Sequence, residues 1–329
     1  MTMNQNKPFS KDIILLHDVE LVVNEIATKL RKDVMFHLKR FGAIVGISGG
    51  IDSAVCMALA VKAFGADKVL GIMLPEKDSS RESEYLAIEL AAKFNVEVIK
   101  EDLTQILSGF DCYGRRDEAV RRIFPDFNSE TYKMKIGIKQ GSLFSNLPPV
   151  FFLTIIGKDG IKQEKILPVK EYLQIVAASN FKQRSRMAML YYHAELRHYA
   201  VIGTPNKHEH NQGFFVKFGD GGADVMPIVN LYKTQVYQLA RQLEIPKEII
   251  ERTPTTDTYT AEQTQEEFFY QMPFELMDIY WYGFENGYSP EEVAATMEEP
   301  VNRVNTLFRN FERKTKTTEY LRMAPIKDY

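Results

Sequence analysis

Residues 46–53 read Gly46-Ile-Ser-Gly-Gly-Ile-Asp-Ser53, and they directly follow the apolar residues Ala43-Ile-Val45. A short run of this kind is typical of a buried parallel strand, and the pattern after Asp52 is typical of a helix. At a strand-to-helix turn, glycines let backbone N–H groups approach an anion closely, and the start of the helix favours negative charge. The stretch therefore predicts a phosphate-binding loop in an α/β fold.

Three polar side chains of this loop indicate what it binds. Ser48 and Ser53 add hydroxyl donors, whereas Asp52 alone would repel a phosphate, so we expect a bridging Mg²⁺. The loop is not a Walker A motif, because no Gly-Lys-Ser/Thr follows, and its glycine spacing differs from the dinucleotide-binding fingerprint. The alternative interpretation is a glycine-rich turn in which Asp52 only caps the helix.

Strands and helices alternate outward from the loop. We expect strands at residues 43–47, 69–74, 96–99 and 200–203, and helices at 18–38, 52–64, 81–94 and 180–199. This alternation predicts a doubly wound parallel sheet with helices on both faces. We treat residues 1–329 as one α/β domain.

Two parts of the chain depart from the alternation. Residues 111–176 are irregular and form a predicted insertion, in which two strand-like runs flank Lys158-Asp-Gly160 and predict a β-hairpin. We expect this hairpin to pack at an edge or a dimer interface and to contribute no catalytic group. Residues 233–329 are mainly helical, and the last clear helix is expected at 302–314.

The composition excludes several classes of protein. The chain has 41 basic and 44 acidic residues and a net charge of −3, which gives no electrostatic footprint for nucleic acid. No apolar run approaches the ~20 residues of a membrane span, and residues 1–11 are polar. Cys56 and Cys112 have no zinc-site spacing. We therefore expect a cytoplasmic protein that binds neither nucleic acid nor membrane.

A strand followed by Ser-Gly-Gly-X-Asp-Ser resembles the PP-loop ATP pyrophosphatases. Further segments resemble the ammonia-dependent NAD synthetases within that group: Leu74-Pro-Glu-Lys-Asp-Ser-Ser80, Arg184-Ser-Arg-Met187, Gly203-Thr-Pro-Asn-Lys-His-Glu209, Gly213-Phe-Phe-Val-Lys-Phe-Gly-Asp-Gly-Gly-Ala-Asp224 and Leu231-Tyr-Lys-Thr-Gln235. The resemblance covers most of residues 18–257. Each segment is modest alone, but their order and spacing together are specific to this family.

The resemblance implies an amide ligase. Such an enzyme adenylates the nicotinate carboxylate of deamido-NAD with Mg-ATP, and ammonia then displaces AMP to give NAD, AMP and pyrophosphate. The family forms homodimers with sites near the interface, so a homodimer is expected. Because few residues precede the first strand, we expect no fused glutaminase domain, and free ammonia, or a separate ammonia donor, is the implied nitrogen source.

The resemblance also implies roles for individual residues. ATP contacts are implied for Gly46, Ser48, Gly49, Gly50, Asp52, Ser53, Thr204, Lys233 and Thr255. Asp52 and Glu209 are the implied Mg²⁺ ligands, and Arg184, Lys217 and Asp224 are the implied contacts to deamido-NAD. Asp52, Asp224 and Lys233 are assigned to catalysis, because metal ions and lysines neutralise phosphate charge and a carboxylate could orient ammonium or accept its proton.

The C-terminal tail departs from the family pattern. A basic His-Lys-Arg stretch is common there, whereas this chain has Tyr320-Leu-Arg322, so Arg322, or else Arg313, is the candidate to replace the lost contact. Three other functions stay open: the same ligation on nicotinate mononucleotide or a biosynthetic acid, non-catalytic nucleotide binding, and tRNA thiolation. For tRNA thiolation, this chain lacks paired cysteines and a basic surface.

Overall fold

The computed structural model describes residues 7–138, 142–144, 150–255 and 259–327, so residues 1–6 of the polar N-terminus and parts of the predicted insertion lie outside it. Its central sheet has four parallel strands in the order β3-β2-β1-β7. They span Ala43–Gly46 (β1), Val69–Met73 (β2), Glu97–Lys100 (β3) and Ala200–Ile202 (β7). Ala43 pairs with both Val69 and Ala200. The predicted parallel sheet is confirmed.

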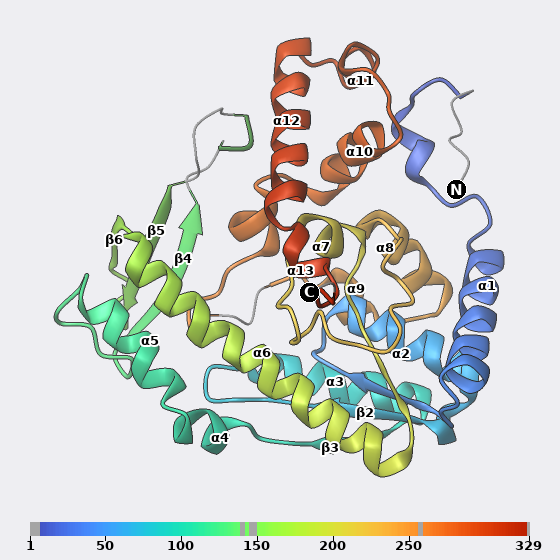
Figure 1. The fold of residues 1–329 in the computed structure, drawn as a ribbon, viewed down its shortest axis with the longest axis horizontal. Coiled ribbons are helices and arrows are strands. Elements are labelled where there is room, and N and C mark those ends of the chain that lie inside the picture. The colour runs from blue at the N-terminus through green and yellow to red at the C-terminus, as the bar shows by residue number, and fades with distance from the viewer. Residues whose placement is uncertain (1–6, 139–141, 145–149, 256–258, 328–329) are drawn as a thin grey trace.

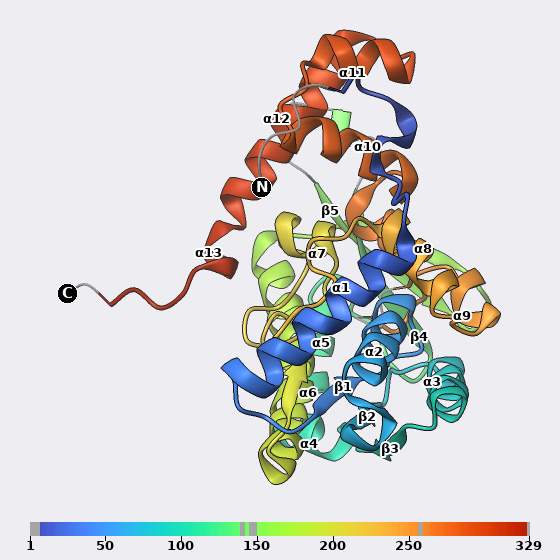
Figure 2. The same ribbon diagram turned by 90° about the vertical axis from the view of Figure 1, so that its right-hand side faces the viewer.

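Helices cover both faces of this sheet (Figures 1 and 2). One face carries α1 (Val19–Lys32), α2 (Ile51–Phe64), α3 (Arg81–Phe94), α8 (Lys233–Gln242) and α9 (Lys247–Glu251), and the other carries α6 (Val169–Arg197). Side chains of β1 alternate between the faces, as a pleated strand requires. Val45 packs into the core with α2, whereas Ile44 packs against Leu190 of α6.

The predicted insertion forms a second, antiparallel sheet in the order β4-β5-β6. After the short helices α4 (Thr104–Gly109) and α5 (Cys112–Arg121) come β4 (Tyr132–Ile138), β5 (Phe151–Gly157) and β6 (Lys162–Ile166). The hairpin of β5 and β6 confirms the prediction, while β4 was missed. Helix α6 begins at Val169, earlier than residue 180, because its first turns pack Ile175 against this sheet.

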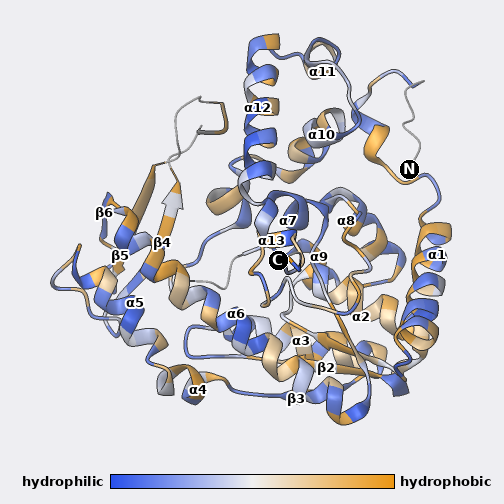
Figure 3. Ribbon diagram, viewed as in Figure 1, coloured by the Kyte–Doolittle hydropathy of each residue, from blue (hydrophilic) through white to orange (hydrophobic). Residues whose placement is uncertain are grey.

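A helical region follows the α/β core and has a hydrophobic core of its own. It comprises η5 (Glu266–Tyr270), α10 (Phe274–Glu285), α11 (Pro290–Met297), α12 (Val301–Thr317) and α13 (Glu319–Arg322). Met277, Trp281, Leu307 and Phe311 pack together there, joined by Ile14 of the N-terminal turn η1 (Lys11–Ile14). In Figure 3, α12 carries much hydrophilic colour, consistent with one apolar stripe, whereas α2 is mostly apolar.

The remaining short elements are η2 (Asp33–His37), which extends α1, η3 (Ala66–Lys68), η4 (Ser142–Phe144) and α7 (Lys207–Gln212). In the described part of the chain, no helix is long and apolar enough to cross a membrane.

Candidate active site

A cavity of about 1040 Å³ lies at the carboxyl ends of the central strands. Loops after β1, β2 and β7 supply part of its lining, including Ser48, Pro75 and Thr204. The chain leaves β1 toward β2 and β3 on one side, and β7 pairs with β1 on the other side. Ligands of open α/β sheets bind at such a switch point, so the topology itself selects this cavity as the candidate site.

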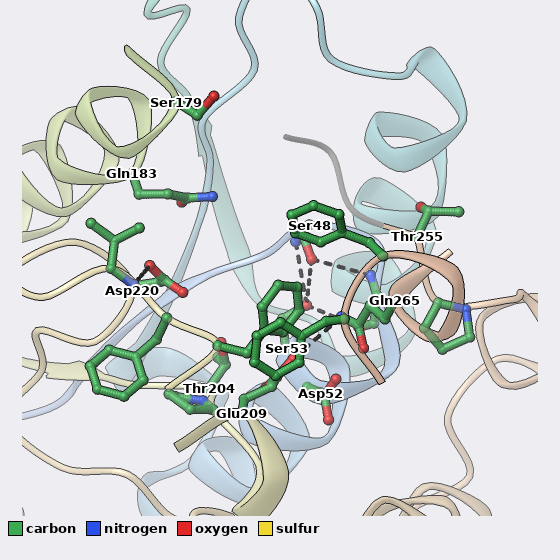
Figure 4. A pocket seen from close by; sticks show the side chains of 18 of the residues that line it. Ser48, Asp52, Ser53, Ser179, Gln183, Thr204, Glu209, Asp220, Thr255 and Gln265 are labelled. Carbon is green, nitrogen blue, oxygen red and sulfur yellow. Dashed lines mark hydrogen bonds between the residues drawn. The ribbon is translucent and has the colours of Figure 1, made fainter. Parts of the chain in front are cut away.

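The phosphate-binding loop is held in shape by its own hydrogen bonds. Gly46 ends β1 and Gly50 caps α2. The Gly50 N–H donates to Ser48 Oγ at 3.3 Å, and the Ser53 hydroxyl donates to the Gly50 carbonyl at 3.0 Å. Gly49 has φ +71°, and a Cβ there would lie 2.6 Å from the Ser83 carbonyl oxygen, so only glycine fits. Figure 4 shows these serines at the cavity.

Two carboxylates and one lysine meet beside the loop. Lys233 is buried and donates to Asp52 Oδ2, and Asn206 Nδ2 donates to Asp52 Oδ1 at 3.4 Å. Glu209 accepts from the Asn206 N–H at 3.0 Å and from Gln265 Nε2 at 3.3 Å. The sequence places these groups far apart, and the parallel sheet and α7 bring them together.

The electrostatics of this group favour a bound cation. Burial, followed by the charge of Asp52, raises the pKa of Glu209 to about 8. Burial acts to lower the pKa of Lys233, but Asp52 and Glu209 outweigh it, so that pKa is raised and the lysine stays charged. Without a cation, Glu209 therefore holds its proton at neutral pH, and a bound cation would instead stabilise its charged form. Within the described ranges no cluster of three or more metal-binding side chains is present. Asp52 and Glu209 nonetheless fit Mg²⁺, which keeps waters and takes phosphate oxygens.

The helical region fixes the position of Lys233, a feature that sequence reasoning missed. Asp278 of α10 is fully buried, and its carboxylate accepts from the backbone N–H of Lys233 at 3.3 Å and of Thr234 at 2.7 Å. It also contacts His208 Nε2. The carboxylate thus caps the start of α8, where a negative group is favourable. His208 is accordingly a packing partner of Asp278 and not a candidate metal ligand.

Thr204 and Thr255, the other predicted ATP contacts, both line the cavity. Thr204 follows β7, and Thr255 forms an isolated bridge with Thr264. Figure 4 shows Thr204 near Glu209 and Thr255 near Gln265. Seven of the nine residues predicted to contact ATP therefore line this cavity. Gly49 lies in the chain between the lining residues Ser48 and Gly50, and Lys233 donates to the lining residue Asp52.

The three predicted deamido-NAD contacts lie outside the cavity lining, and two of them, Arg184 and Lys217, contact each other. Arg184 Nε donates to the Lys217 carbonyl at 3.2 Å, and Lys217 Nζ donates to the carbonyls of Tyr320 and Met323 at 2.8 Å each. Asp224 accepts from the Tyr191 hydroxyl at 3.2 Å and from the Val201 N–H at 2.8 Å. All three are exposed or partly exposed. Arg184 and Lys217 form a surface pair linked to the C-terminal tail, whereas Asp224 is bonded to α6 and β7.

Asp220 lines the cavity instead of Asp224. Its Oδ1 accepts from the Val216 N–H at 2.9 Å, and burial raises its pKa to about 6. Gln183 and Arg186 of α6 also line the cavity, and Arg186 Nε donates to the Leu74 carbonyl at 3.2 Å. The Gly-Asp-Gly-Gly-Ala-Asp stretch contains both aspartates, and no local pattern indicates which one turns inward.

The tail and the insertion both reach the cavity, through residues that were not predicted. Arg322 is bonded to the carbonyls of His210, Asn211 and Thr315 and does not line the cavity, whereas Tyr320 and Leu321 do. From the insertion, Ile138, Leu143 and Phe151 line it, and the Phe151 ring stacks on Tyr172 with centroids 4.4 Å apart. The hairpin therefore packs against the site as well as at an edge.

Comparison with known proteins finds related sequences over most of the chain. The NAD synthase family model matches residues 22–136 and 156–325, and the break between the two matched segments falls within the predicted insertion. The NH₃-dependent NAD⁺ synthetase of Mesorhizobium japonicum is 44% identical over 95% of this chain and 98% of its own length. The enzyme of the same name from Rhizobium meliloti is 42% identical over 96% and 94%.

Solved structures share the fold at lower identity. An NH₃-dependent NAD synthetase from Campylobacter jejuni superposes with a TM-score of 0.62 at 19% identity, covering 95% of this chain and all of that one. An NMN synthetase from Francisella tularensis gives a TM-score of 0.61 at 22% identity over 94% and 98%. At these identities the likeness concerns the fold alone. The family match and the relatives above 40% identity show that this chain belongs to the NAD synthase family.

Proposed function

We propose that this chain is an ammonia-dependent NAD synthetase, which joins ammonia to the nicotinate carboxylate of deamido-NAD and converts ATP to AMP and pyrophosphate. The observation that carries the proposal is the Asp52–Lys233–Glu209 group beside a preformed phosphate-binding loop: Asp52 and Glu209 line the cavity, and Lys233 donates to Asp52. A carboxylate is a poor electrophile, so it needs activation before ammonia can attack. Transfer of AMP to it requires a site that neutralises phosphate charge.

The loop and its neighbours suit that first step. The Ser48 and Ser53 hydroxyls and the N-terminus of α2 would hold the pyrophosphate part of ATP, as anions bind at helix starts. Asp52 and Glu209 would hold Mg²⁺, which when bound supplies neutralising charge at the phosphates. Lys233, kept charged by both carboxylates, adds a fixed positive charge beside them.

The second substrate requires a separate surface. We propose that Arg184, Lys217 and Asp224 bind deamido-NAD from the side of the C-terminal tail, because Lys217, which contacts Arg184, donates to the carbonyl of the lining residue Tyr320. Three exposed apolar side chains support a homodimer that covers them: Tyr192 and Leu196 of α6, and Phe218. The two free, buried cysteines accord with a cytoplasmic location.

The experiment that tests the function is product analysis. The purified protein is incubated with Mg-ATP, ammonium and one acid at a time: deamido-NAD, nicotinate mononucleotide or an unrelated carboxylate. The amide products are identified by mass spectrometry. We expect NAD from deamido-NAD, with AMP and pyrophosphate in equal amounts. Release of ADP and orthophosphate would contradict the assignment of the loop, and amidation of nicotinate mononucleotide alone would move the substrate to that acid.

A further inference from the structure

Helix α12 turns one lysine toward the cavity. Its buried residues Val304, Leu307 and Phe311 follow the three- and four-residue spacing of an inward face. Lys314 comes three residues after Phe311 and continues this face, and it lines the cavity. A lysine on the apolar stripe of a helix is uncommon, because burial of its ammonium without a partner is unfavourable.

The surroundings of Lys314 leave its charge unmatched. Its Nζ lies 3.2 Å from the centre of the Phe269 ring and donates one long bond of 3.4 Å to the Phe269 carbonyl. Within the described ranges no carboxylate pairs with it, and burial lowers its pKa to about 7. Arg313, the preceding residue, is more exposed, also lines the cavity, and has no ion pair with a described residue. Two neighbouring cations therefore face the cavity without an anion.

The other cations of the cavity have protein acceptors. Arg186 donates to the Leu74 carbonyl, and Arg252 donates to the Gly49 carbonyl and to the Ser83 hydroxyl. Lys233 lies beside the phosphate loop, where it is paired with Asp52. Arg322 is surrounded by backbone carbonyls. Arg186, like Lys314, has only a carbonyl acceptor among the described residues, but it projects from α6. Arg313 and Lys314 are the two lining cations that project from α12, which is not an element of the phosphate loop.

We propose that Arg313 and Lys314 form a subsite for a phosphate group of the acid substrate, so that α12 helps to select a phosphorylated nicotinate over a free carboxylic acid. The inference rests on the proposed function. A phosphate supplies the missing anion, and a charged hydrogen bond to it compensates for the desolvation of the ammonium. Tyr320 and Leu321, which line the same cavity, offer no positive charge for that task.

The test compares Lys314→Met, Lys314→Arg and Arg313→Gln with the wild type. Steady-state kinetics give KM for deamido-NAD and for ATP, and calorimetry gives Kd for deamido-NAD without ATP. We expect Lys314→Met to raise KM and Kd for deamido-NAD roughly ten- to a hundred-fold and to leave KM for ATP within about two-fold. Lys314→Arg should recover part of the affinity, and Arg313→Gln should show a smaller loss.

Thermal stability separates binding from a structural role. The folded pKa of Lys314 lies below its unfolded value of 10.5, so its contribution to stability is present above that pH and is lost as the pH falls through about 7. Methionine removes this penalty, so Lys314→Met should have an unchanged or higher Tm at pH 7.5. The matched control is Lys316→Met on the same helix, because Lys316 is exposed and paired with Glu312. It should change neither KM.

Three results would overturn the subsite. They are an unchanged Kd for deamido-NAD in Lys314→Met, a loss confined to KM for ATP, and an equal loss in Lys316→Met. Failure of the proposed function is distinct, because it appears as a wild type that forms no NAD. If that wild type amidates nicotinate mononucleotide, the same variants are measured with that acid, and an unchanged KM again rejects the subsite.

Discussion

The phosphate loop and the surface that we assign to the acid substrate are built in different ways. The loop consists of eight consecutive residues that bond to one another, as Ser48, Gly50 and Ser53 do. The acid-binding surface takes Arg184 from α6, Lys217 from the loop after α7, and tail residues about a hundred positions later. A local motif specifies its own geometry, whereas a dispersed surface depends on how every element packs.

The largest expected loss concerns the loop region. Asp52→Asn and Glu209→Gln should each lower kcat/KM by about 10²–10³-fold, because each removes charge that stabilises the transition state at the phosphates. Steady-state kinetics at saturating Mg²⁺ measure this, and circular dichroism should show an unchanged fold. Glu84→Gln is the control, since Glu84 also lines the cavity but is paired with Lys100. Near-normal activity of Glu209→Gln would make Glu209 only a partner of the Asn206 capping box.

A smaller loss is expected on the dispersed side. Arg322 holds α13 against the carbonyls of His210, Asn211 and Thr315, and so positions Tyr320 and Leu321 in the cavity wall. Arg322→Ala should raise KM for deamido-NAD about ten-fold through a loosened tail and leave KM for ATP nearly unchanged. An unchanged KM for deamido-NAD would remove the tail from the substrate site.

The buried carboxyl of Asp220 should make the stability of the fold depend on pH. Its folded pKa of about 6 exceeds the ordinary 3.8, so its contribution to stability is present below about pH 4 and is lost as the pH rises through about 6. Asp220→Asn keeps an acceptor for the Val216 N–H and removes the buried charge. We expect a gain of about 1–3 kcal/mol in unfolding free energy at pH 8 that vanishes near pH 4. Denaturant titrations at both pH values measure it, and a gain independent of pH would point to another cause.

The same contrast explains what the sequence could predict. Strands β1, β2 and β7 are short apolar runs beside turn signals, and the loop is a motif, so both could be predicted from local sequence. Helix α6 was placed too late because its buried residues are divided among separate cores, with Ile175 in one and Leu190 in another. No local pattern connects Asp278 to Lys233, since 45 positions separate them and only the packing of α10 on α8 brings them together. The apolar spacing of α12 did indicate that position 314 faces inward, but a lysine there is normally interpreted as an exposed residue.

The smallest effect is expected at the tip of the insertion, and there the comparison can be made within one hairpin. Lys158, Asp159 and Lys162 are exposed, while Phe151 at the other end of β5 stacks on Tyr172 in the cavity wall. Alanine at the three charged positions should leave kcat within a few-fold, because none of these side chains lines the cavity. Phe151→Ala should instead raise KM several-fold for at least one substrate, since the stacked pair contributes about 0.5–1.5 kcal/mol beyond its buried area. Steady-state kinetics on both variants decide the matter. A large loss of kcat from the tip substitutions would give the insertion a catalytic group, and a Phe151→Ala enzyme with unchanged constants would confine the insertion to the edge of the fold.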